Sequence, residues 1–244
     1  MLSVIPGGHG VTVLPGAVAG AAPEAVPDAS AAPARAHRPR ADALRNRERL
    51  VTAAREMFVE FGPHVPYDEI ARRAGVGNAT LYRNFPERAR LVHEVVLSLT
   101  ERVTALADRA AEEEADSFAA IRRFTHGAVE ERFGALCPML DGTFDKEHPE
   151  LTAGRERFER AVQRLFDRAH EAGRLRADVG VGDLMVALAQ LARPLPGVSC
   201  GRFDRFVHRH LQLFLDGLEA PARSELPGSA VTLEDLRRES RPLS

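Results

Sequence analysis

The amino-acid sequence predicts an all-α protein in which a small helix-turn-helix domain precedes a larger helical domain. Apolar residues recur at helical spacing over most of the chain, and no segment alternates with the two-residue period of a β-strand. Within residues 47–91 the pattern indicates a long helix, two short helices separated by a glycine, and the start of another long helix. This order is typical of a helix-turn-helix, so duplex DNA is the expected partner.

The first 40 residues differ in composition from the rest of the chain. Up to residue 34 they contain no lysine or arginine, and proline and glycine interrupt every apolar run. A secretory signal needs a basic start and a continuous apolar core, so we expect a disordered extension over 1–40. Its basic end, Arg35, Arg38 and Arg40, fits an arm lying along DNA and a solvated linker equally well.

A single apolar stripe indicates the first helix. Asp42 is its expected N-cap, and Gly62 followed by Pro63 ends it. Arginine and glutamate side chains occupy the other faces, so we expect a helix with one buried side. The stripe residues, three or four positions apart, are Leu50, Ala53, Ala54, Met57, Phe58 and Phe61.

Two shorter helices follow, with a sharp turn between them. Pro66 suits a first helical position, and Asp68 and Glu69 favour the positive end of the helix dipole. Gly75 permits the turn because glycine adopts positive φ without steric cost. Segment 78–85 is the candidate recognition helix, since its first turn carries small or short polar residues that can approach base edges.

Candidate DNA contacts lie on and around this recognition helix. Leu81 and Phe85 are four positions apart and should face inward. The hydroxyl of Tyr82 and the amide of Asn84 suit phosphate oxygens. Spacing alone also allows two short amphipathic helices of an all-α protein that binds no DNA. The predicted DNA-binding set is Arg45, Asn78, Ala79, Thr80, Tyr82, Arg83, Asn84 and Arg88.

The run IARRAGVGNATLYRNFPERARLV, residues 70–92, resembles the N-terminal domain of TetR-family transcriptional repressors. The shared pattern is an Ile-Ala pair, a glycine turn, a Thr-Leu-Tyr-x-x-Phe recognition helix and a basic start to the next helix. The resemblance implies that Tyr82 and Asn84 contact phosphates and that Arg88 is the basic residue opening the next helix. It places Asn78, Ala79, Thr80 and Arg83 on the surface that meets bases.

The chain departs from the family pattern in three places. Residues 63–66 replace a segment that is more often rich in Thr and Ser, Gly77 stands where Ser is common, and Asn84 stands where His is common. These departures leave the fold expectation intact and the operator sequence unreadable. The resemblance further implies a homodimer that leaves a pseudo-palindromic operator when a small molecule binds. The two cysteines form no disulfide framework, which favours a reduced, cytoplasmic environment.

Helical periodicity continues to residue 218. Helices are expected from Glu87 towards Ala111, from Asp116 over Ala128, from Thr152 to Gly173, over 181–191 and over 202–218, with irregular chain between Gly134 and Pro149. Asp116 is the expected N-cap of the second of these helices. We therefore expect a helix-turn-helix domain at 41–91, an effector-binding and dimerisation domain at 92–218, and a loosely ordered tail at 219–244.

The last two helices are more apolar than the surface of a monomer usually is. Either they are buried in the core or they pair with a second copy across a two-fold axis. TetR-like proteins dimerise through their last two long helices, so the resemblance favours pairing. The predicted interface consists of Leu184, Leu188, Leu191, Phe203, Phe206, Val207, His210 and Phe214.

An apolar pocket for an unidentified small-molecule effector is expected among the middle helices. Aromatic side chains with a few polar groups are what such a site requires, although any helical core has the same composition. The candidate lining residues are Phe118, Arg122, His126, Phe133, Met139 and Phe158.

Charge and composition disfavour other classes of protein. The net charge is +4 over residues 35–95 and −6 over the remainder, which suits a DNA-reading end on an acidic body. No run of about 18 apolar residues is available to span a membrane. Cys137 and Cys200 give no disulfide framework, and no motif orients a base towards Cys137 for thiol catalysis.

We expect neither a metal site nor a cofactor, because His208 and His210 lie on different helix faces and belong to no ligand cluster. The expected function is transcriptional repression under the control of an effector. Two alternatives stay open: a constitutive DNA-binding structural protein without an effector, and an all-α interaction or enzyme module with a vestigial helix-turn-helix.

Overall fold

The computed structural model describes residues 38–134, 136, 142, 144–191 and 200–239. Over these residues the backbone forms nine helices and no strand, so the predicted all-α fold class is confirmed. The helices are α1 (Arg38–Phe61), α2 (Tyr67–Ala74), α3 (Asn78–Asn84), α4 (Arg88–Glu113), α5 (Ser117–Glu130), α7 (Pro149–Glu171), α8 (Val181–Leu191), α9 (Cys200–Leu218) and α10 (Leu233–Glu239).

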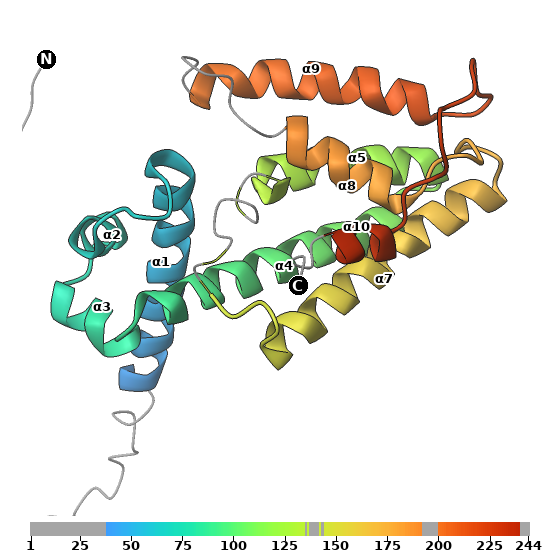
Figure 1. Cartoon of the computed structure of the whole chain (residues 1–244). Coiled ribbons are helices and arrows are strands. Elements are labelled where there is room, and N and C mark those ends of the chain that lie inside the picture. Colours follow the sequence, from blue (N-terminus) through green and yellow to red (C-terminus); the bar gives the residue numbers. More distant parts are fainter. Residues whose placement is uncertain (1–37, 135, 137–141, 143, 192–199, 240–244) are drawn as a thin grey trace, which may run out of the picture.

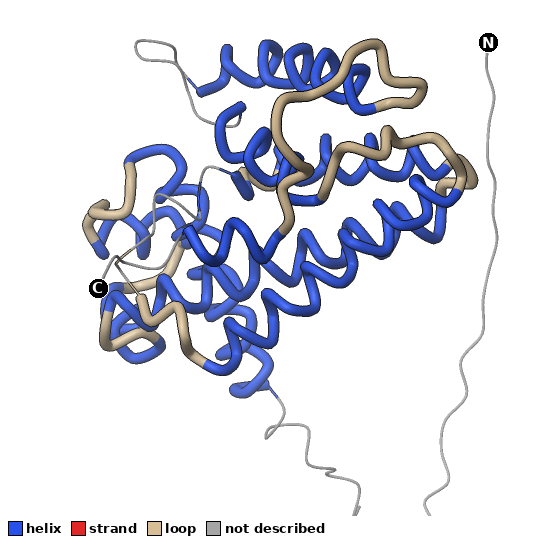
Figure 2. The backbone as a smooth tube through the Cα atoms, turned by 45° about the vertical axis from the view of Figure 1, so that its right-hand side comes forward, coloured by secondary structure: helices blue, strands red, loops and turns tan. Residues whose placement is uncertain are grey.

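Helix α4 joins a small lobe to a large one (Figure 1). Its start packs against α1, next to α2 and α3, and the rest of it packs against α5 and α7. α9 forms an outer layer over α5 and α8. Figure 2 shows α4 and α7 running side by side through the large lobe. A displacement in the large lobe can therefore reach the small lobe through α4.

The inner face of α1 is the apolar stripe that the sequence predicts, with one exception. Leu50, Ala54 and Phe58 are fully buried. Phe61 is 60% exposed, because it lies in the last turn of α1 at the rim of a hollow that Val65 and Pro66 also line. The expectation that Phe61 belongs to the core is therefore wrong.

The turn between α2 and α3 has the conformation predicted at Gly75. Its φ is +64°, in the left-handed region that side chains disfavour. Its N–H meets the carbonyl oxygens of Ala71 and Arg72, and the next N–H, of Val76, donates to the Ala71 carbonyl at 3.0 Å. This C-cap ends α2 and fixes the direction in which α3 leaves.

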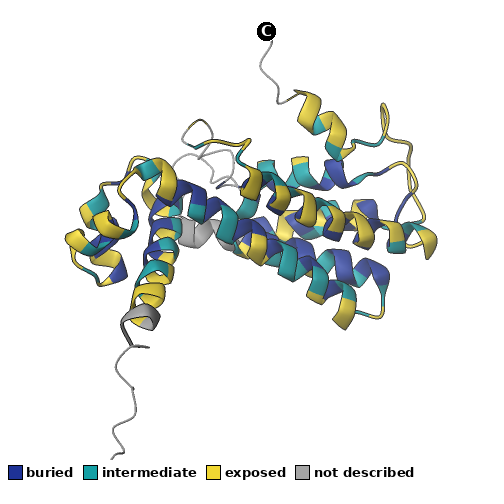
Figure 3. Ribbon diagram, turned by 90° about the horizontal axis from the view of Figure 1, so that it is seen from below, coloured by how far each residue is buried: buried dark blue, intermediate teal, exposed yellow. Residues whose placement is uncertain are grey.

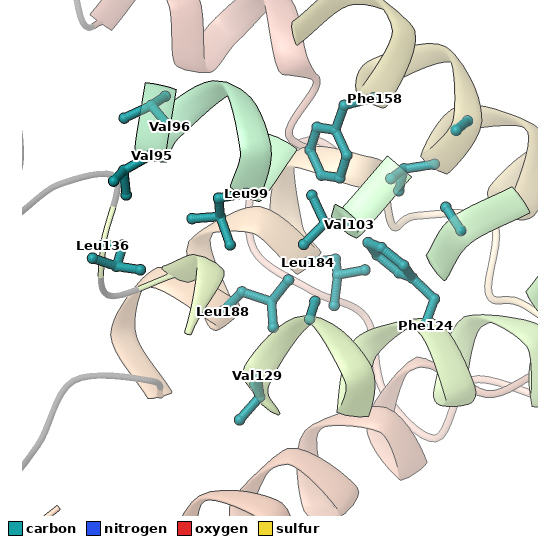
Figure 4. Packing of buried hydrophobic residues seen from close by; sticks show 14 of the residues in the cluster. Val95, Val96, Leu99, Val103, Phe124, Val129, Leu136, Phe158, Leu184 and Leu188 are labelled. Atoms are coloured by element: carbon teal, nitrogen blue, oxygen red, sulfur yellow. The ribbon is translucent and has the colours of Figure 1, made fainter. Parts of the chain in front are cut away.

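One face of α4 forms the centre of the large lobe. Val95, Leu99 and Val103 are spaced four positions apart and are fully buried. Figure 4 shows them among apolar side chains of α5, α7 and α8, including Phe124 and Leu188. No helix of the described residues is long and apolar enough to cross a bilayer.

The start of each of two long helices is capped by a side chain. Asp116 caps α5 as predicted, its carboxylate accepting from the Ala119 N–H at 2.7 Å. α7 begins at Pro149, earlier than the predicted Thr152, because the imidazole of His148 accepts from the Glu150 N–H at 3.3 Å. Proline at a first helical position loses no hydrogen bond, so the earlier start is inexpensive.

The segment after residue 219, for which the sequence predicts a loosely ordered tail, is held against the large lobe as far as residue 239. The Gly182 N–H donates to the Val231 carbonyl at 2.8 Å, and the Val231 N–H donates to the Asp183 carboxylate at 3.2 Å. A Cβ atom at Gly182 would lie 2.4 Å from the Val231 oxygen, so only glycine admits this approach. Arg237 on α10 also pairs with Glu159 at 3.3 Å.

Candidate nucleic-acid interface

Helix α3 is anchored from behind and presents short side chains in front. Leu81 and Phe85 are fully buried, as the spacing predicts. Asn78 and Ala79 are exposed and Thr80 is half-buried. Figure 3 shows the helices of the small lobe at one end of the molecule, with exposed residues on their outer side. The first turn of α3 is thus free to approach a flat or grooved partner closely.

Tyr82 extends from α3 with 54% of its surface exposed. Its ring packs against the ring of Tyr67, the first residue of α2, at 5.3 Å between centroids and 57° between planes. Burial raises the pKa of the Tyr67 phenol, which therefore stays protonated. The ring contact orients Tyr82 without using its hydroxyl.

We expect Tyr82→Phe to weaken binding to all DNA duplexes by a similar factor while sequence preference is kept. The ring would still pack on Tyr67, and only the hydrogen bond to phosphate would be lost. Equilibrium titration of several unrelated duplexes would check this. A change confined to one base position would contradict a positioning role for the hydroxyl.

Arg83 and Asn84 make hydrogen bonds within their own helix. The Nε of Arg83 donates to the Ala79 carbonyl at 3.0 Å, although its side chain lies on the surface. The amide nitrogen of Asn84 donates to the Thr80 carbonyl at 2.8 Å. Arg83 can swing outward from its exposed position, whereas the half-buried Asn84 has one of its two amide hydrogens already engaged.

Arg88 opens α4, as the resemblance implies, but its guanidinium faces the protein. The Nε donates to the Pro63 carbonyl at 2.9 Å, and Nη2 donates to the same oxygen. The guanidinium also lies over the rings of Phe58 and Tyr67, at 5.5 and 5.6 Å from their centroids. This placement argues against the predicted DNA contact and gives Arg88 the role of tying the loop before α2 to α4.

Two arginines of α1 in the small lobe form ion pairs within the protein. Arg45 forms an exposed ion pair with Asp42. Asp42 lies inside α1 and not at its start, so the prediction that Asp42 is the N-cap is wrong. Arg47 is not among the residues that the sequence predicts to bind DNA. Its guanidinium lies over the Phe85 ring, 4.6 Å from the ring centroid, and its Nη2 lies 2.5 Å from the Glu94 carboxylate of α4. Its other amino group donates to the Asn84 carbonyl at 3.4 Å. Arg47 therefore connects α1 and the end of α3 to α4.

Comparison with known proteins agrees with this geometry. Residues 50–95 match the bacterial regulatory proteins of the tetR family, and residues 116–220 match the C-terminal domain of SbtR-like transcriptional regulators. A TetR transcription regulatory protein from Mycobacterium vanbaalenii is 31% identical and superposes with a TM-score of 0.55, over 74% of this chain and 99% of its own. The chain belongs to the TetR family.

Two further relatives are similar to this TetR-family protein. A TetR transcriptional regulator from Streptomyces coelicolor is 29% identical, with a TM-score of 0.54 over 72% of this chain and 99% of its own. The nucleoid occlusion factor SlmA of Vibrio campbellii is 29% identical over 126 residues. That match spans 50% of this chain and 61% of SlmA, less than two thirds of the relative's length. The two TetR proteins of solved structure that match most of this chain are transcription regulators rather than enzymes, which confirms the expected class of protein.

The candidate effector residues fall into three groups in the TetR-family protein. Phe133 and Phe158 pack together at 4.9 Å, while the Arg122 guanidinium lies over the Phe118 ring at 5.3 Å. His126 stacks on His208 of α9, with 2.9 Å between their Nδ1 atoms, and burial lowers the pKa of His126. Met139 lies outside the described residues.

The predicted dimer interface needs correction at three residues. Leu184, Leu188 and Val207 are 0%, 1% and 2% exposed within one protomer, so they cannot contact a second copy. The cause is that α8 is covered by α7, α9 and α10 of its own chain. Leu191 and Phe214 are half-buried, His210 is exposed and bonds to the Phe206 carbonyl, and the side chain of Phe203 lies outside the described residues.

The apolar surface that α9 does expose lies on its outer side. Phe206 is 41% exposed and Leu213 is 60% exposed. Both residues line one shallow hollow with polar neighbours on the same helix, and we call this surface the outer α9 face. It consists of Phe206, Arg209, Gln212, Leu213 and Asp216.

Proposed function

We propose that this protein is a homodimeric transcriptional repressor that binds a pseudo-palindromic operator in the cytoplasm and is released by a small molecule. The observation that carries DNA binding is the geometry of α3. Leu81 and Phe85, both fully buried, hold the helix from behind, while its first turn presents short side chains outward. A helix held in this way fits the major groove with its N-terminal end against the bases.

The division into two lobes supports a separate role for each domain. Residues 41–91 would bind DNA and residues 92–218 would bind the effector and form the dimer. The outer α9 face supports the dimer, because exposed Leu213 and Phe206 form an apolar centre with polar residues around it. Two protomers related by a two-fold axis would place two copies of α3 in successive major grooves.

Release by an effector is supported by the path of α4. The Phe133–Phe158 contact lies in the core that packs on α4, and the same helix continues into the small lobe. A ligand that separates α5 from α7 would tilt α4 and change the spacing of the two recognition helices. The coupling free energy would appear equally in DNA affinity and in ligand affinity.

We expect Thr80→Ala and Arg83→Ala each to relax preference at one or two bases per half-site, at a cost of roughly 1–3 kcal/mol for a good contact. Selection of bound DNA from a random duplex pool would measure this. The matched control is His64→Ala, because His64 is exposed in the same lobe but lies outside α3. Selected sequences that are unchanged in both α3 variants would contradict the assignment of α3 as the reading helix.

A second candidate function is constitutive DNA binding without an effector. The similarity to a nucleoid occlusion factor over half of the chain favours it, as does the close packing of Phe158 in the core, where it is 5% exposed. An operator affinity that no small molecule changes would support this alternative over the repressor.

A further inference from the structure

Three potential metal ligands meet where α4 passes the start of α7. The Nε2 atom of His93 lies 3.0 Å from a carboxylate oxygen of Glu150, and the same oxygen lies 3.8 Å from Nδ1 of His148. The two imidazole rings contact edge to face, with 4.4 Å between their centroids. One ligand atom from each of the three residues falls within 4.8 Å of the other two.

These distances suit a tetrahedral ion. Zinc bonds of about 2.0–2.1 Å to imidazole nitrogen and carboxylate oxygen place neighbouring ligand atoms roughly 3.3 Å apart. The observed separations of 3.0 and 3.8 Å lie on either side of that value, and all three ligand atoms fall within 4.8 Å of one another, so the side chains are close to the spacing that an ion needs. Two imidazoles and one carboxylate form a donor set that suits divalent transition metals better than it suits Mg²⁺ or Ca²⁺.

We propose that His93, His148 and Glu150 form a binding site for a divalent transition-metal ion, with Zn²⁺ as the best match. The His93 side chain is only 6% exposed and would anchor the ion from the inside, whereas Glu150 is 56% exposed and leaves an approach from solvent. Three protein ligands leave the fourth tetrahedral position for water or for an incoming ligand.

A bound ion would replace two hydrogen bonds of the cluster and would lie near one arginine. The ion would take the place of the 3.0 Å hydrogen bond between His93 Nε2 and the Glu150 carboxylate. His148 gives up only the 3.3 Å N-cap bond to the Glu150 N–H when its Nδ1 binds metal. Arg90 is the neighbouring cation, and it is half-exposed and paired with Glu94 at 3.3 Å, which reduces its repulsion.

The position of the site gives the ion a structural consequence. The ion would link the start of α7 to His93 of α4. The next residue along α4 is Glu94, whose carboxylate pairs with Arg47 of α1. Arg47 in turn donates to the carbonyl of Asn84 at the end of α3. Bound metal would therefore restrain the large lobe against the turn of α4 that holds the recognition helix. Any effect on operator affinity rests on the proposed function, but metal binding itself does not.

The test is a zinc titration of the full metal-free chain in competition with a chromogenic chelator. His148→Asn removes the imidazole but keeps a preferred N-cap residue, so α7 should still begin at Pro149. Glu150→Gln removes the carboxylate and keeps a side chain that can hydrogen-bond to His93. The control is His64→Ala, which removes an exposed histidine from the small lobe.

We expect the wild-type protein and His64→Ala to bind one Zn²⁺ per chain with the same affinity. Both ligand variants should lose more than about tenfold in affinity while their helical circular dichroism is unchanged. Equal zinc affinity in wild type, His148→Asn and Glu150→Gln, or no stoichiometric binding to the wild type, would overturn the proposal and leave the cluster as a capped hydrogen-bonding group. Because no DNA is present, failure here is distinguishable from failure of operator binding.

Discussion

Leu188→Glu is expected to unfold the large lobe rather than to separate two subunits. Leu188 is 1% exposed, and its own backbone oxygen lies so near Gly134 that a Cβ atom there would approach it to 2.2 Å. A carboxylate at this position would lie among the buried apolar side chains seen in Figure 4, and burying it there should cost at least about 3 kcal/mol. Thermal unfolding followed by circular dichroism would measure the loss.

The control for this substitution is Leu188→Met, which keeps the side-chain volume and should cost less than about 1.5 kcal/mol. A Leu188→Glu protein that melts like the wild type would contradict the placement of α8 in the protomer core. A folded Leu188→Glu monomer would show that α8, and not the outer α9 face, forms the interface.

Leu213→Glu is expected to leave the protomer folded but to make it monomeric. Leu213 is 60% exposed at the centre of the outer α9 face, so its carboxylate would stay hydrated in the monomer and be desolvated only in a dimer. Loss of the second half-site should lower operator affinity towards the non-specific value, roughly 10³-fold or more. Sedimentation and fluorescence anisotropy would measure the two effects.

Leu226→Glu is the matched control, because Leu226 is also an exposed leucine, at 43%, but lies in the segment after α9. That variant should remain a dimer with wild-type operator affinity. A Leu213→Glu protein that still sediments as a dimer would move the interface away from the outer α9 face.

The small lobe could be predicted from the sequence because local rules decide it. The apolar stripe of α1, the positive φ of Gly75 and the inward pair Leu81 and Phe85 each follow from spacing or from one residue's conformational freedom. Asp116 could be assigned as a cap for the same reason. Such features depend on neighbours within about one or two helical turns.

The remaining features depend on which distant segments meet. Periodicity shows that Leu188 lies on an apolar face, but not whether its own chain or a second copy covers that face. The meeting of His93 with Glu150 joins positions 57 residues apart, and no spacing rule indicates it. The tail packs on Gly182 because this residue has no side chain. Nothing in the sequence distinguishes Gly182 from any other glycine.

The central claim is that two copies of α3 read two half-sites of one operator. The most direct test is equilibrium binding, at fixed salt, to a duplex selected from a random pool and to the same duplex with one half-site scrambled. We predict an inverted repeat with half-sites about one helical turn apart or a multiple of it, and loss of most of the affinity when one is scrambled. Equal affinity for the intact and the half-scrambled duplex would contradict the claim.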